Sequence, residues 1–91
     1  MKARAHIIVK GIVQGVGFRY FAYRHALMFQ LKGWVANLPN GNVEVEVEGE
    51  KSNLHAYIKE LRIGPRFANV HDVIVTWKEY QDQFNSFDIG Y

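Results

Sequence analysis

The sequence contains no cysteine, which excludes a disulfide framework, a zinc–thiolate site and a thiol nucleophile. A chain without cysteine suits a reducing compartment, so we expect a cytoplasmic protein. Prolines are also scarce, with two in 91 residues, and 48% of the residues are hydrophobic. This composition favours a packed core over disorder. We expect residues 1–91 to form one domain, since a chain of this length can bury a core and fold alone.

Long apolar runs are missing as well. No segment approaches the roughly 20 apolar residues with which a helix spans a bilayer. The short apolar stretch near the N-terminus is not long enough for a signal peptide. The formal net charge is only +2, which can attract a small anion but does not by itself indicate nucleic-acid binding. We therefore expect neither a membrane nor a nucleic acid as a partner.

The hydrophobic pattern predicts strands and helices in alternation. Period-two alternation and β-branched residues mark strands, and apolar residues with a period near 3.6 mark helices. The predicted strands cover residues 4–10, 34–37, 43–48, 70–78 and 84–91, and the predicted helices cover residues 18–31 and 51–63. The order β-α-β-β-α-β, followed by a short C-terminal strand, indicates an α+β, ferredoxin-like sandwich. In this fold an antiparallel sheet packs both helices on one face, and many unrelated functions use it.

Glycines are expected to mark the ends of these elements. Gly11 should stop the first strand, Gly33 the first helix and Gly64 the second helix, where Pro65 follows. Asn40-Gly41 is the strongest short signal for a hairpin turn. The apolar face expected on the first helix comprises Phe18, Phe21, Ala22, Ala26, Met28 and Phe29, with His25 at its edge.

The segment 14–19 is the first candidate functional site. It consists of Gln14, Gly15, Val16, Gly17, Phe18 and Arg19 and leads from a predicted strand into a helix. Two glycines free the backbone to turn its N–H groups inward, and a helix N-terminus adds unpaired donors and partial positive charge. These features favour an anion pocket, with Arg19 able to donate two hydrogen bonds to a phosphoryl group. The loop lacks the lysine and Ser/Thr of a nucleotide-binding P-loop, and a plain strand–helix turn with a surface arginine is the alternative.

Asn37 is the second candidate, just before the predicted hairpin turn. Its amide offers both a donor and an acceptor, so it could orient a water molecule. The alternative is that Asn37 only braces the turn through a local backbone hydrogen bond.

Together these two stretches carry a family resemblance. Residues 13–19, Val-Gln-Gly-Val-Gly-Phe-Arg, and residues 33–44, Gly-Trp-Val-Ala-Asn-Leu-Pro-Asn-Gly-Asn-Val-Glu, closely resemble the two signature stretches of acylphosphatases. The spacing between Arg19 and Asn37 also resembles that of the family. The resemblance extends to Glu48-Gly49, to Gly64-Pro65 and to the Phe87-Asp88-Ile89 ending.

The resemblance implies a metal-independent hydrolase that cleaves the carboxyl–phosphate bond of acyl phosphates without a cofactor. By the same resemblance, residues 14–18 and Arg19 bind the phosphoryl group and Asn37 positions the attacking water. Inorganic phosphate or another anion would then act as product or inhibitor, and a monomer is expected. One departure concerns the C-terminus, where the family often has a basic residue before a final aromatic and this chain has Gly90-Tyr91. We assign no role to Gly90 and expect Tyr91 to pack near the loop.

Other polar residues have simpler interpretations. No two histidines stand four residues apart, so we predict no metal site, and His25 should be a partly buried residue at the edge of the core. The alternating glutamates over 44–50 are interpreted as the solvated face of a half-buried strand. The remaining residues interpreted as structural are His6, His55, His71, Trp34, Trp77, Arg62 and Arg66.

Three rival functions remain. An RNA-recognition domain has the same element order but needs exposed aromatics on its central strands, where this chain has glutamates. A regulatory domain could bind an anion with the same loop and not hydrolyse it. Acylphosphatase-like domains also occur inside larger maturation proteins, but the start methionine and the complete motif set favour a free-standing enzyme.

Overall fold

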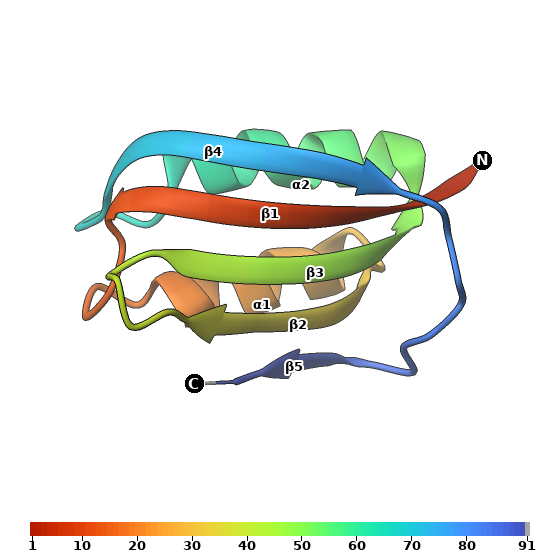
Figure 1. Cartoon of the computed structure of the whole chain (residues 1–91), viewed down its shortest axis with the longest axis horizontal. Coiled ribbons are helices and arrows are strands. Elements are labelled where there is room, and N and C mark those ends of the chain that lie inside the picture. The colour runs from red at the N-terminus through yellow and green to blue at the C-terminus, as the bar shows by residue number, and fades with distance from the viewer. Residues whose placement is uncertain (91) are drawn as a thin grey trace.

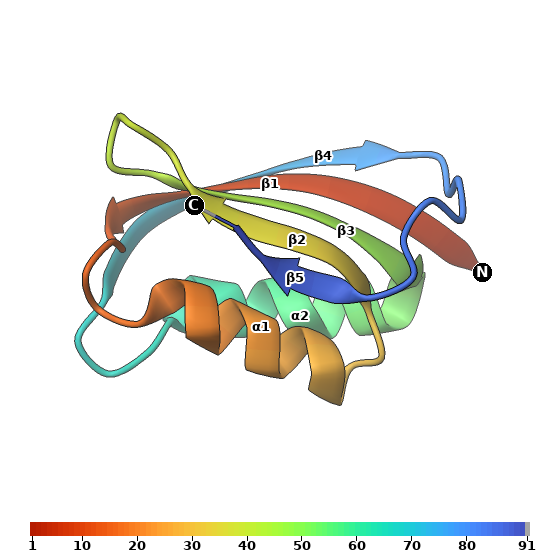
Figure 2. The same ribbon diagram turned by 90° about the horizontal axis from the view of Figure 1, so that it is seen from below.

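The computed structural model describes residues 1–90 and has two layers. The elements are β1 (Lys2–Ile12), α1 (Phe18–Met28), β2 (Lys32–Asn37), β3 (Val43–Glu50), α2 (Lys51–Ile63), β4 (Asn69–Lys78) and β5 (Phe87–Ile89). The sheet has the order β4-β1-β3-β2-β5, and both helices cover one of its faces (Figures 1 and 2). The predicted ferredoxin-like sandwich is therefore confirmed. No helix in residues 1–90 is both long and apolar enough to span a membrane.

The last strand departs from the predicted antiparallel sheet. β1, β2, β3 and β4 pair antiparallel with their neighbours, but β5 pairs parallel with β2. The cause is the path of residues 79–86, which we call the strap. It leaves the end of β4, crosses that end of the sheet and returns along the opposite edge (Figure 1). The chain then runs in the same direction as β2.

The core lies between the sheet and the helices. Period-two alternation on the central strands directs Ile7, Val45 and their neighbours to this side, where they are fully buried. The helices contribute Phe18, Ala22, Ala26, Leu54, Tyr57 and Leu61. The Tyr57 hydroxyl donates a 2.9 Å hydrogen bond to the Ala22 carbonyl and so links α2 to α1. Burial raises the Tyr57 pKa, which keeps the phenol neutral.

The first helix is shorter than predicted. It ends at Met28, and Gln30 adopts the left-handed turn with φ 57°. Met28 is exposed, so its assignment to the apolar face was wrong. Gly33 lies inside β2 at φ 149°, where a Cβ atom would come within 1.9 Å of the Glu46 carbonyl oxygen. This glycine therefore permits close approach of β2 and β3 and does not end the helix.

The first strand also continues past its predicted stop. Gly11 lies within β1, next to a register shift against β4 between Lys10 and Gly11. A Cβ atom at Gly11 would come within 2.1 Å of the Asn69 carbonyl oxygen. The second helix, in contrast, covers residues 51–63 as predicted, and Gly64 ends it with φ 73°.

The glutamates of β3 are not all solvated. Glu46 is 4% exposed and Glu48 is 3% exposed. On the sheet face opposite the helices, Glu46 contacts Arg4 and Lys78, and the strap covers Glu48. The Glu48 carboxylate accepts backbone hydrogen bonds from Gln81 at 2.7 Å and Gln83 at 2.9 Å. Alternation shows which side chains leave the core, but it does not show whether another segment covers them. The predicted solvated face was therefore wrong for these two residues.

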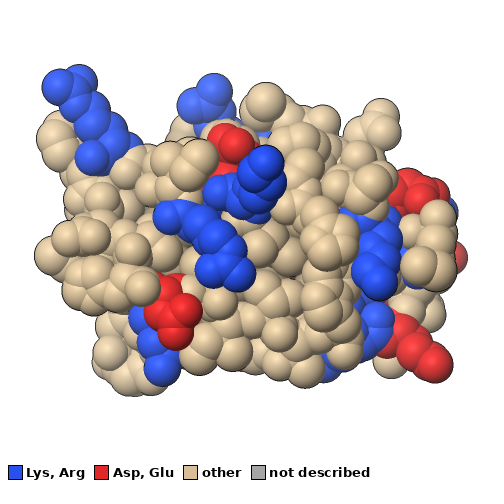
Figure 3. Space-filling view, turned by 90° about the horizontal axis from the view of Figure 1, so that it is seen from above, with Lys and Arg blue, Asp and Glu red and all other residues tan. Residues whose placement is uncertain are grey.

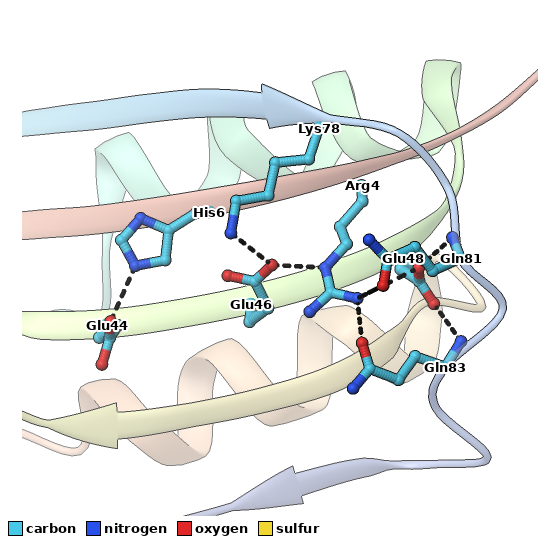
Figure 4. Close-up of polar contacts among 8 residues, drawn as sticks. All are labelled: Arg4, His6, Glu44, Glu46, Glu48, Lys78, Gln81 and Gln83. Carbon is cyan, nitrogen blue, oxygen red and sulfur yellow. Dashed lines mark hydrogen bonds and ion pairs between the residues drawn. The ribbon is translucent and has the colours of Figure 1, made fainter.

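Arg4 completes this buried polar cluster (Figure 4). Its Nε donates to Glu46 at 2.5 Å, and its Nη1 lies 3.6 Å from Glu48 and also donates to Gln83. Its guanidinium stacks over the Phe84 ring at 4.9 Å. The strap is thus fixed to β1 and β3 by charge-assisted hydrogen bonds.

Candidate active site

The loop between β1 and α1 has two glycines in the left-handed region. Gly15 has φ 74° and Gly17 has φ 79°. A Cβ atom at either position would meet no atom within 4 Å. The backbone conformation, and not a lack of space, is therefore the reason that glycine fits these positions.

The loop presents free backbone donors. The N–H groups of Gly15, Val16, Gly17 and Phe18 donate to no backbone carbonyl within residues 1–90. The Gly17 carbonyl accepts from the Phe21 N–H at 3.0 Å and so begins α1. Free donors at a helix N-terminus, together with the helix dipole, make a site for an anion.

Arg19 lies in the first turn of α1 and contacts the C-terminal segment. Its Nη1 donates to the Gly90 carbonyl at 2.7 Å. The Gly90 N–H in turn donates to the Val35 carbonyl at 2.6 Å, which fixes this segment beside β2. The Gly90 backbone therefore orients Arg19, a contact that the sequence analysis did not anticipate. The predicted position of Tyr91 falls outside the described residues.

Asn37 is the last residue of β2, and its side chain has an unsatisfied acceptor. The Oδ1 atom is buried and accepts no hydrogen bond from residues 1–90. The hairpin turn is instead braced by other groups, with Asn40 Oδ1 accepting from the Asn42 N–H at 3.0 Å. A buried amide oxygen without a partner is costly. Its presence here is expected where the amide contacts a ligand or a water molecule.

Gln14 joins the loop to the turn that follows Asn37. Its Nε2 donates to the carbonyls of Leu38 and Asn42, both at 2.8 Å. Sequence reasoning assigned Gln14 to the phosphate loop and missed this contact of its side chain. No local signal identifies it, because the two acceptors are backbone carbonyls 24 and 28 residues away.

Most of these residues line one cleft of about 260 Å³. The β1–α1 loop, the turn between β2 and β3 and the C-terminal segment lie at the same end of the sheet (Figures 1 and 2). The lining residues are Val13, Gly15, Gly17, Phe18, Arg19, Tyr20, Asn37 and Ile89. The structure thus places both Arg19 and Asn37 in the lining of one cleft. Gln14 and Val16 are not lining residues. Among residues 1–90, Arg19 is the one charged residue that lines this cleft, so these residues favour an anion.

A second cleft, of about 210 Å³, lies at the other end of the molecule beside the strap. Two lysines, Lys2 and Lys32, line it, but so do Glu48 and Glu50. The acidic pair offsets the lysine charge, and the Glu48 carboxylate already accepts hydrogen bonds from the strap. Acidic side chains thus line this cleft together with its lysines, whereas Arg19 is the one charged residue among residues 1–90 that lines the first cleft.

The histidines are not grouped as metal ligands. Within residues 1–90, no three His, Cys, Asp or Glu side chains lie close enough to hold a metal ion. His25 is half-buried against the Phe21 ring, with ring centroids 4.1 Å apart, as expected for a residue at the edge of the core. His6 pairs with Glu44 at 2.8 Å on the sheet face opposite the helices (Figure 4).

Comparison with known proteins gives a consistent result. The family model described as "Acylphosphatase" matches residues 5–89. An acylphosphatase of Geotalea uraniireducens is 45% identical over 91 residues, which is 100% of both chains. An acylphosphatase of Moorella thermoacetica is 50% identical over 76 residues, covering 84% of this chain and 82% of that protein. The crystal structure of acylphosphatase from Bacillus subtilis superposes with a TM-score of 0.94 at 38% identity and covers 100% of both chains.

Proposed function

Because this chain belongs to the acylphosphatase family, it hydrolyses the carboxyl–phosphate bond of acyl phosphates, and we propose the residues that do so. In this proposal the loop of residues 14–19 binds the phosphoryl group through the backbone N–H groups of residues 15–18, with Arg19 as its cationic partner. Asn37 positions the attacking water. The observation that carries the proposal is the single cleft in which Arg19, the glycine loop and the unpartnered Asn37 Oδ1 converge.

The phosphoryl group binds to the loop backbone and to Arg19. We assign the oxyanion to the backbone N–H groups of residues 15–18. These groups have no backbone acceptor within residues 1–90, so they gain the most from hydrogen bonds to an anion. In this proposal the Arg19 guanidinium donates to the phosphoryl oxygens, and its Nη1 contact with the Gly90 carbonyl orients it. In phosphoryl transfer, negative charge spreads over the equatorial oxygens, which these donors stabilise.

Asn37 binds the attacking water through Oδ1. The water oxygen forms the new bond to phosphorus, and the bond from phosphorus to the acyl oxygen breaks. The electron pair leaves with the carboxylate, which is a good leaving group and needs no strong general acid. An amide is a poor base, so the water proton passes to a phosphoryl oxygen. Catalysis then consists mainly of positioning and charge stabilisation, with no metal or cofactor required.

The enzyme acts as a monomer in this proposal, because one chain supplies Arg19, Asn37 and the glycine loop to the same cleft. A cytoplasmic location stays a prediction based on the lack of cysteine. RNA binding is disfavoured, since the sheet face opposite the helices has Arg4, His6 and the glutamates of β3 where stacking aromatics are needed. Figure 3 also shows Lys and Arg side chains dispersed among uncharged and acidic residues on one face, not in a basic stripe.

The test is hydrolysis of benzoyl phosphate with EDTA present. Arg19→Ala and Asn37→Ala should each lower kcat/KM by at least about 10²-fold. The matched controls Arg62→Ala and Asn85→Ala alter exposed residues outside the cleft and should keep native activity. Inhibition by inorganic phosphate should weaken in the Arg19 variant and persist in the Asn37 variant.

Three outcomes would contradict the assignment. Strong loss of activity with EDTA would show that a metal is needed. A folded Asn37→Ala variant with native kcat would remove Asn37 from water positioning. A native protein that binds phosphate and hydrolyses no acyl phosphate would instead be an anion-binding domain.

A further inference from the structure

Two exposed apolar residues line the cleft together with Arg19. Tyr20 follows Arg19 in α1, and Ile89 precedes Gly90, whose carbonyl binds Arg19. Tyr20 is 59% exposed and Ile89 is 45% exposed. Single exposed apolar residues are common and need no explanation. Here, however, both line the same anion cleft, next in the chain to Arg19 or to its partner Gly90.

The Tyr20 ring has neighbours that fix its position. The Arg24 guanidinium lies over the ring, 5.7 Å from its centroid. The Tyr23 ring stacks at a centroid distance of 6.2 Å with an interplanar angle of 26°. Both neighbours lie three or four residues further along α1, on the same helix surface. An aromatic side chain ordered in advance loses little conformational entropy when a ligand packs against it.

The reaction geometry places the acyl group beside Tyr20 and Ile89. The acyl carbon is separated from phosphorus by one oxygen atom, so the acyl group must lie within a few ångströms of the phosphoryl group. The phosphoryl group is bound at Arg19 in the proposed function, and the residues flanking Arg19 and Gly90 are Tyr20 and Ile89. The volume of about 260 Å³ lies below the roughly 300–1,000 Å³ typical of drug-sized ligands. It therefore suits a short chain or a single ring.

The charge of the cleft restricts the acyl group further. Among residues 1–90, Arg19 is the one charged residue that lines the cleft. In the proposed function it binds the phosphoryl group, so a second negative charge on the acyl group would find no further cation among these lining residues. Apolar groups, in contrast, gain by covering the exposed faces of Tyr20 and Ile89.

We propose that Tyr20 and Ile89 form an acyl subsite that selects acyl phosphates with an uncharged apolar group, and aromatic groups most strongly. This inference rests on the proposed function, since it assumes that the phosphoryl group binds at Arg19. It names a substrate class for the same cleft.

The test compares benzoyl phosphate with acetyl phosphate, which differ in the apolar area that they offer. The readout is the ratio of kcat/KM for benzoyl phosphate to that for acetyl phosphate, expressed relative to the native ratio. This normalisation cancels the different intrinsic reactivities of the two substrates. Tyr20→Ala should lower the ratio roughly two- to tenfold, the range typical of one aromatic contact. Ile89→Ala should lower it by a smaller factor.

Matched controls are available on other parts of the surface. Phe67 is an exposed aromatic with the Arg66 guanidinium 5.6 Å from its ring centroid, and it does not line the cleft. Ile74 is 43% exposed on β4 and matches Ile89. Phe67→Ala and Ile74→Ala should keep the native ratio. A second pair of equal chain length, butyryl and succinyl phosphate, should show lower kcat/KM for succinyl phosphate because of its extra carboxylate.

Two results would overturn the subsite. In the first, Tyr20→Ala and Ile89→Ala lower kcat/KM equally for benzoyl and acetyl phosphate, so that the ratio does not change. In the second, the native enzyme prefers succinyl over butyryl phosphate. Failure of the proposed function looks different, because Arg19→Ala would then retain activity towards both substrates. The same assays therefore separate the two.

Discussion

Replacing Arg4 with methionine tests the buried polar cluster beneath the strap. The Arg4 side chain is 11% exposed, and it faces Glu46 and Glu48, whose side chains are 5% and 3% exposed. Arg4→Met keeps an unbranched, apolar stem and removes the charge. Two buried carboxylates then lose their shared cation, and a buried charge without its partner is strongly destabilising.

The magnitude follows from the partners that remain. Removing one partner of a buried ion pair costs about 3–5 kcal/mol. Glu46 keeps Lys78 at 3.3 Å, and Glu48 keeps two backbone N–H donors. We therefore expect Arg4→Met to lower the free energy of unfolding by about 3 kcal/mol, which is the lower end of this range. For a domain of this size, this loss corresponds to a fall in Tm of roughly 12–24 °C.

The assay is urea and thermal unfolding of the native protein, Arg4→Met and the double variant Arg4→Met/Glu46→Leu. The double variant should regain part of the loss, because it no longer buries the Glu46 carboxylate. Arg66→Met removes an arginine that also stacks on a phenylalanine but lies at the surface, so it should change stability by less than about 0.5 kcal/mol. If Arg4→Met costs no more than Arg66→Met, the cluster does not stabilise the fold and the reasoning is refuted.

Three further predictions concern the site and the core. Gln14→Leu removes two hydrogen bonds to the turn after Asn37 and should lower kcat about tenfold, with little change in inhibition by phosphate. If steady-state kinetics show that phosphate affinity falls by the same factor as kcat, this prediction is contradicted. Tyr57→Phe should cost about 1 kcal/mol at neutral pH. Because the pKa of Tyr57 is raised, native stability should fall as pH rises above about 10, and urea unfolding against pH should show a shallower fall in the Phe variant. Gly33→Ala places a Cβ 1.9 Å from the Glu46 carbonyl oxygen and should lower the free energy of unfolding by at least about 3 kcal/mol. A variant that unfolds thermally at the native Tm would refute the close approach of β2 and β3 at this position.

Local signals were enough to predict much of the fold. The second helix was predicted over its full length because its end depends on one nearby residue, Gly64 with φ 73°. The end of the first helix was wrong because a non-glycine residue, Gln30, takes the left-handed turn. The role of Gly33 was predicted wrongly because it depends on the neighbouring strand β3, whose backbone leaves no room for a Cβ atom. No local sequence pattern reveals that contact.

Long-range contacts explain what sequence reasoning missed. The burial of Glu48 depends on the strap, whose N–H groups lie 33 and 35 residues further along the chain. In the site, the local signals of the loop and the turn made Arg19 and Asn37 candidates, and the resemblance to acylphosphatases supplied the roles predicted for them. The contacts of the Gln14 side chain and of the Gly90 carbonyl were not predicted, because each involves a distant backbone group that any residue type could supply. Sequence therefore identified the groups proposed for the reaction, and not the ones that orient them.

The position of Gly90 has a consequence for biosynthesis. Arg19 and the carbonyl that orients it are separated by 71 residues. The central strand β1 likewise lacks both its neighbours until β3 and then β4 have been made. On the ribosome, the N-terminal half can therefore expose the glycine loop long before the cleft is complete. We expect hydrolytic activity to appear only after Gly90 has left the exit tunnel, so a nascent chain carries an unfinished site until that residue emerges.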